Sequence, residues 1–210
     1  GMRMWDPVAV PAGWRAVAPA LPGFDGAEPP PAASTAIDDY ARFIIDFMDH
    51  LHVDSAVLGG VSMGGYVAFA AWRLEHLRWR GLVLADTRPG ADSEQGRAGR
   101  EKALETIRTR GTHGLAEEML PKLLGETTRA RQPQLVDHVR RVIERQTNQG
   151  VNDAVVRLRD RPDSTPLLPE IGVPALIIVG EEDAITTPAA ISAELAGTRR
   201  RVQRMQARAF

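Results

Sequence analysis

The chain has 210 residues, of which 43% are hydrophobic and 25% charged, and its 26 basic and 27 acidic side chains nearly cancel. This balance gives no support for binding to nucleic acid or to an anionic membrane surface. The absence of cysteine excludes disulfides, thiolate catalysis and thiolate metal sites. The five histidines show no paired spacing on a helical face, so we expect neither a metal site nor a cofactor.

No apolar run reaches the length of a membrane span, and no signal peptide opens the sequence. We therefore expect a soluble protein of the cytoplasm. A chain of this length can bury a sizeable core, and a single domain with an insertion is the natural expectation.

The first elements alternate between strand and helix. Residues 14–18 are predicted as a short strand, followed by a loop rich in glycine and proline. Thr35 is the candidate N-cap of an amphipathic helix. Near-continuous apolar runs are typical of parallel strands covered on both faces. Three such runs predict further strands: 55–59, which a helix follows directly, 81–86 and 175–180.

About 85 residues of a different character separate the last two of these strands. A connection between parallel strands needs only about a dozen residues, so the segment is interpreted as an insertion. Its apolar spacing predicts helices at 97–110, 114–124, 133–146 and 152–160. We expect an α/β fold with a doubly wound, mostly parallel sheet. Residues 1–87 and 164–210 would form its core, and 88–163 a helical cap.

A G-x-S-x-G motif connects the strand at 55–59 to the following helix. Its fixed positions are Gly60, Ser62 and Gly64. In this context the serine lies on a sharp strand-to-helix turn, and side chains two residues to either side of it would collide. Ser62 is therefore the candidate nucleophile, and the Met63 N–H is the candidate donor to an oxyanion. A glycine-rich turn with an incidental serine is the alternative interpretation.

The sequence resembles the α/β-hydrolase superfamily, and more narrowly its small esterases and lactonases of the 3-oxoadipate enol-lactonase type. The segments that carry the resemblance are 60–66, 82–88, 163–168 and 180–183. It implies hydrolysis of a small carboxylic ester or lactone through an acyl-enzyme, without a cofactor. The serine at position 62 argues against the haloalkane dehalogenase and epoxide hydrolase branches, which use aspartate there.

The same resemblance assigns the triad acid to Asp183, because Gly180 and Pro188 complete the family pattern around it. The acid of such a triad orients a histidine and stabilises its imidazolium. Asp86, directly after the strand at 81–86, is the rival acid, although it lacks the Gly-x-x-Asp setting. A solvated loop aspartate is the alternative interpretation of Asp183.

The family pattern is incomplete at both ends. The triad order of this fold is serine, acid, histidine, yet no histidine follows Asp183. All five histidines precede it, at 50, 52, 76, 113 and 138, and each is interpreted as a surface or helix-terminal residue. His113 or His138 could in principle reach the site from the cap. The segment that would supply a second oxyanion donor has no counterpart before residue 4, and Ala20 replaces a family aspartate.

These departures predict a chain that lacks the family's first strands and its histidine segment, with little turnover of its own. Unpaired strand edges would favour homo-oligomers. Two alternatives to an active hydrolase stay open, a catalytically inactive scaffold that binds small molecules or partners and a truncated or frameshifted gene product. The arginine-rich residues 199–208 are interpreted as solvated rather than as a nucleic-acid site.

Overall fold

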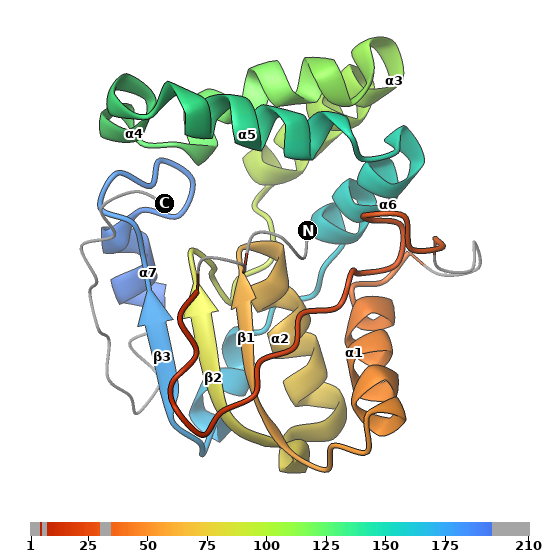
Figure 1. The fold of residues 1–210 in the computed structure, drawn as a ribbon, viewed down its shortest axis with the longest axis vertical. Coiled ribbons are helices and arrows are strands. Elements are labelled where there is room, and N and C mark those ends of the chain that lie inside the picture. The colour runs from red at the N-terminus through yellow and green to blue at the C-terminus, as the bar shows by residue number, and fades with distance from the viewer. Residues whose placement is uncertain (1–4, 6–7, 30–34, 195–210) are drawn as a thin grey trace.

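The computed structural model describes residues 5, 8–29 and 35–194 (Figure 1). These residues contain a parallel sheet of three strands in the order β1-β2-β3. The strands are β1 (Ala56–Val61), β2 (Trp79–Ala85) and β3 (Ala175–Ile178). All three apolar runs therefore form the strands predicted from them, and the α/β class is confirmed.

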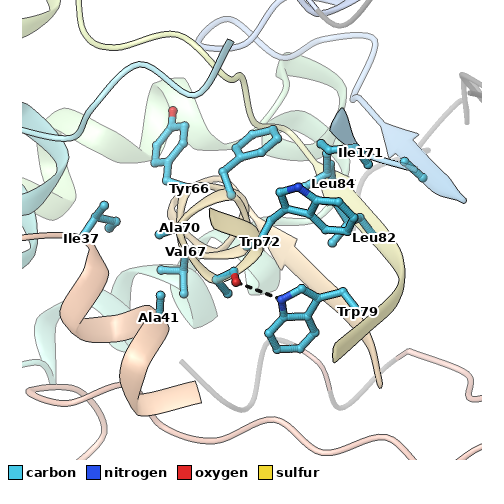
Figure 2. Packing of buried hydrophobic residues seen from close by; sticks show 14 of the residues in the cluster. Ile37, Ala41, Tyr66, Val67, Ala70, Trp72, Trp79, Leu82, Leu84 and Ile171 are labelled. Atoms are coloured by element: carbon cyan, nitrogen blue, oxygen red, sulfur yellow. Dashed lines mark hydrogen bonds between the residues drawn. The ribbon is translucent and has the colours of Figure 1, made fainter. Parts of the chain in front are cut away.

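The helices α1 (Asp38–His50) and α2 (Met63–Glu75) build most of the core with the sheet. α2 packs against α1 and against β1 and β2. In Figure 2, α2 is seen between Ile37 and Ala41 on one side and Leu82 and Leu84 on the other. Every residue from 65 to 72 of α2 is buried, because the helix is covered on several sides. Burial of this kind fixes the first turn of α2, and with it the motif that precedes it.

Trp79 ties the start of β2 to the middle of α2. Its indole Nε1 donates to the Ala71 carbonyl oxygen at 3.0 Å, and its side chain is almost completely buried (Figure 2). A buried indole N–H requires such an acceptor. The short 3-10 helix η2 (His76–Arg78) makes the turn between the two elements.

The segment between β2 and β3 is helical, as its periodicity predicts. It contains α3 (Glu94–Leu123), α4 (Glu126–Arg131), α5 (Pro133–Glu144) and α6 (Asn148–Arg159). α3 is interrupted at Gly111, where φ is 64° and ψ is −165°, so it corresponds to the two helices expected there. α3, α4 and α5 lie beyond the carboxyl ends of the strands (Figure 1). The division into core and cap at residues 88 and 163 stays a prediction.

The chain returns to the sheet through the 3-10 helix η3 (Thr165–Glu170) and continues after β3 into α7 (Pro188–Glu194). No helix of the described ranges is long and apolar enough to cross a membrane. Residue 4 and the arginine-rich segment 199–208 lie outside the described residues. Homo-oligomers and a cytoplasmic location stay predictions.

Two predicted features of the N-terminal region are wrong. Residues 14–18 form no strand, and Trp14 and Val17 are 62% and 53% exposed. A strand exists only where a neighbour completes its hydrogen bonds, and none of the described strands pairs with this segment. Thr35 is not the N-cap of α1. Ile37 holds that position without a capping side chain, and Asp38 and Asp39 supply negative charge to the first turn instead.

Candidate active site

The carboxyl end of β1 carries Ser62 on a strained turn. Its φ and ψ are 50° and −110°, an unfavourable combination for a residue with a side chain, and it occupies the N-cap position of α2. The Ser62 N–H donates to the Ala85 carbonyl oxygen at 2.8 Å, and its own carbonyl oxygen accepts from the Gly65 N–H at 2.9 Å. The turn is thus bonded both to β2 and to α2, as the motif predicts for a strand-to-helix connection.

Two glycines allow this turn, and they differ from the predicted pair. A Cβ at Gly60 would overlap the backbone carbonyl of Gly64, as expected. A Cβ at Gly64 would meet no atom within 4 Å outside its chain neighbours and its own helix, so Gly64 is not crowded against the sheet. The crowded position is Gly65, where a Cβ would stand 2.5 Å from the Cβ of Thr87. The crowding at Gly65 comes from the segment after β2, which a motif confined to residues 60–64 cannot reveal.

Met63 is the first residue of α2. The first N–H groups of a helix have no partner within it, and the helix dipole adds positive potential at the same point. An anion beside Ser62 would therefore meet a favourable field. This is the position expected of an oxyanion donor.

The acid Asp183 is held by its own loop after β3. Its Oδ1 accepts from the N–H groups of Ile185 and Thr186 at 2.7 and 2.8 Å, and the Thr186 hydroxyl donates to Oδ2. Three donors on one carboxylate fix its orientation. These bonds hold the Asp183 side chain against its own loop, and its assignment as the triad acid stays a prediction.

The rival acid Asp86 lies beside Asp183, near Gly180. Its φ of 45° is strained, and its Oδ1 accepts from the Gly180 N–H at 2.9 Å. Burial raises the pKa of Asp86, the Gly180 bond lowers it, and the charge and hydrogen bond of Asp183 raise it further, so that the net shift is upward. The two carboxyls predicted as alternatives are therefore neighbours in one site. Sequence spacing could not show this, because 97 positions separate them.

The chain as a whole matches the sequence profile of the α/β hydrolase fold family over residues 2–207. It belongs to the α/β-hydrolase family. A thermophilic esterase from Thermogutta terrifontis, solved with malate bound, is 35% identical, with a TM-score of 0.83 over 88% of this chain and 68% of that one.

Two curated relatives match over less of their own length. 3-Oxoadipate enol-lactonase 2 of Acinetobacter baylyi is 25% identical over 166 residues, which are 78% of this chain and 60% of the relative. Haloalkane dehalogenase 2 of Mycobacterium tuberculosis is 38% identical over 80 residues, which are 38% of this chain and 28% of the relative. The chain thus spans less than two thirds of each of these curated relatives.

The histidine contacts that the structure of this α/β-hydrolase describes involve neither Ser62 nor the two acids. His113 in α3 bonds through Nδ1 to Glu144 Oε1 at 2.8 Å and lies 3.5 Å from Glu117. His138 in α5 is exposed, and His76 packs its ring against Trp72. These contacts agree with the predicted surface and helix-terminal roles.

The loop that carries the acid also contacts the helical segment. Glu182, next to Asp183, accepts from the Thr127 N–H at 3.0 Å and from its hydroxyl at 2.5 Å. These two bonds lower the pKa of Glu182, the hydroxyl bond most. Glu182 thus caps the first turn of α4 from the neighbouring loop. No sequence signal pointed to this pair, because α4 and Glu182 are distant along the chain.

A buried ion pair joins the two segments that connect the hydrolase sheet to its helices. Arg161 Nη1 lies 2.8 Å from Asp92 Oδ1, and their side chains are 2% and 3% exposed. Arg161 Nη2 donates to the Gly90 carbonyl oxygen at 2.9 Å, and its guanidinium lies 4.1 Å from the centre of the Tyr66 ring. Burial raises the pKa of Asp92, but bonds from Arg100 and Arg161 outweigh it and leave the pKa lowered.

The arrangement offers no described centre for a metal. Within residues 5, 8–29 and 35–194, no group of three or more histidine and acidic side chains could hold a metal ion.

Proposed function

We propose that this protein is a serine hydrolase that acts on a carboxylic ester or lactone through an acyl-enzyme. The observation that carries the proposal is the strained backbone of Ser62, with φ of 50°, at the junction of β1 and α2. Strain at an exposed turn is costly and is characteristic of functional sites. The esterase and enol-lactonase named among the similar proteins support the same substrate class.

In the proposed reaction, Ser62 Oγ attacks the carbonyl carbon of the substrate and its proton passes to a general base. The Met63 N–H stabilises the oxyanion that forms, and the alcohol leaves to give a seryl ester. Water then hydrolyses this ester and restores the serine. Asp183 orients the histidine that acts as base and stabilises its charged form.

The general base of the proposed reaction comes from outside the segment that follows Asp183. Residues 184–210 contain no histidine. The base would therefore be His113, His138 or another group that does not belong to residues 184–210. A serine hydroxyl is a poor nucleophile without a base. Loss of one triad member leaves roughly 10³–10⁴-fold catalysis over water. The second candidate function, a catalytically inactive scaffold that binds a small molecule, is favoured by this missing histidine alone.

Imidazole in solution can substitute for a missing base and so separates the two candidates. We expect hydrolysis of an activated aryl acetate to be slow and to rise with imidazole more steeply for the wild type than for Ser62→Ala. The Ser62→Ala variant serves as control, because imidazole itself cleaves aryl esters. Equal rates for both proteins at every imidazole concentration would reject the serine hydrolase and favour the scaffold. Rapid Ser62-dependent turnover without imidazole would show that the base is already present.

A further inference from the structure

Thr87 contacts the proposed nucleophile turn from another element. It follows β2, its side chain is 1% exposed, and its Oγ1 donates to the Ser62 carbonyl oxygen at 3.0 Å. A buried hydroxyl is placed where it has a partner, and here the partner is the backbone of the proposed nucleophile itself.

This carbonyl belongs to the same peptide unit as the Met63 N–H. A trans peptide is planar, so its C=O and N–H point in opposite directions. A group that holds the Ser62 oxygen on one side therefore sets the direction of the Met63 N–H on the other. We propose that Thr87 is a positioning residue that aims the Met63 N–H at the oxyanion. This inference rests on the proposed serine hydrolase.

The first turn of α2 donates two hydrogen bonds of different length to the Ser62 carbonyl oxygen. The oxygen accepts from Gly65 N at 2.9 Å but from Tyr66 N only at 3.4 Å. The ordinary helical bond is thus the longer of the two, and the Thr87 hydroxyl supplies a third donor. Unlike the helical donors, Thr87 is attached to β2 and fixes the peptide relative to the sheet. Donor position matters because oxyanion stabilisation depends on preorganised geometry.

Gly65 makes this approach possible. A Cβ at Gly65 would stand 2.5 Å from the Thr87 Cβ, so any larger residue would force Thr87 away from the turn. The glycine after the motif and the threonine after β2 are therefore matched to each other. The contact with Thr87 explains why position 65 is a glycine, although Gly65 lies outside the G-x-S-x-G motif.

The test compares Thr87→Val with Thr87→Ser. Valine keeps the shape and removes the hydroxyl, whereas serine keeps the hydroxyl and removes the methyl group. Ser62 would be labelled with a fluorophosphonate in the presence of imidazole, and labelling followed by mass spectrometry over a range of reagent concentrations. We expect Thr87→Val to lower the saturating rate about two- to tenfold, the range of one net hydrogen bond, without changing the half-saturating concentration. Thr87→Ser should label close to the wild-type rate.

A second measurement is independent of reactivity. The Met63 amide ¹⁵N–¹H resonance should move in Thr87→Val and stay near its wild-type position in Thr87→Ser, with thermal unfolding checking that both variants fold. Wild-type labelling with an unchanged Thr87→Val rate would overturn the inference and leave the serine hydrolase standing. Equal slowing in both variants would assign the effect to packing and overturn it too. No labelling of Ser62 in the wild type would reject the serine hydrolase, and the inference with it.

Discussion

Asp86 and Asp183 come together beside Gly180 at the carboxyl ends of β2 and β3, and Asp183 raises the pKa of Asp86. Asp86 reaches this position from a backbone with φ of 45° and is also bonded to the Gly180 N–H. Asp183 accepts from several donors of its own loop, whereas the Asp86 carboxyl accepts from the single backbone N–H of Gly180. Burial and the neighbouring Asp183 together raise the pKa of Asp86, so that the charged form of Asp86 is disfavoured.

The raised pKa of Asp86 gives stability a definite pH dependence. In the unfolded chain the Asp86 carboxyl has a pKa near 3.8, whereas in the folded protein its pKa is higher. Ionisation of Asp86 therefore lowers the free energy of unfolding as pH rises above that value. We expect Asp86→Asn to raise the free energy of unfolding at pH 7, because asparagine can keep the Gly180 bond without a charge. The gain should vanish near pH 3, measured by urea unfolding. A loss of stability at pH 7 would contradict the assignment of the proton to Asp86.

The same pair distinguishes the two candidate triad acids by activity. Asp183→Asn should remove imidazole-independent turnover and destabilise the protein by about 1.5–3 kcal/mol, since it replaces a charged acceptor of several hydrogen bonds. Asp86→Asn should retain most of the activity. The measurement is Ser62-dependent ester hydrolysis by each variant without imidazole, with Ser62→Ala as the blank. The reverse pattern would make Asp86 the acid that orients the histidine.

The two glycines after the serine predict opposite effects of the same substitution. Gly64→Ala should be neutral or stabilise by up to about 1 kcal/mol, because alanine favours a helix and its Cβ meets open space. Gly65→Ala should destabilise by about 1–3 kcal/mol through overpacking against Thr87. Urea unfolding of the two variants provides the comparison. Similar effects of both would mean that Thr87 moves aside at no cost.

Local sequence signals predicted the elements well and the contacts between them poorly. The strands, the helical segment and the turn at Ser62 follow from apolar periodicity and from glycine spacing, which act over a few residues. The strand predicted at 14–18 is wrong, because a strand depends on a distant partner. The roles of Gly65 and Thr87 and the meeting of Asp86 with Asp183 arise where separate strands end side by side. A sequence pattern within one segment cannot predict such contacts between residues of different segments.

The bond between Glu182 and Thr127 predicts a pH-sensitive contact between the acid loop and α4. Because the pKa of Glu182 is lowered, the contact is fully present above the ordinary glutamate pKa of 4.5 and is lost as pH falls through the folded value. Glu182→Gln should therefore speed amide hydrogen exchange of residues 126–131 at pH 7 with little change in thermal unfolding. Thr127→Val should reproduce the effect. Unchanged exchange in both variants would show that the contact does not hold α4.

The pair of Arg161 and Asp92 should behave as a buried unit. Arg161→Met removes the guanidinium from Asp92, from the Gly90 carbonyl and from the Tyr66 ring, so we expect a loss of about 3–5 kcal/mol in urea unfolding. Asp92→Asn alone should also destabilise, because it leaves Arg161 buried beside a neutral partner. The double variant should lose less than the sum of the two, since neither charge then remains uncompensated. Additive losses would show that Arg161 acts through its carbonyl and ring contacts rather than through Asp92. Arg100, which also bonds Asp92 but is more exposed, provides the control, and Arg100→Met should cost far less.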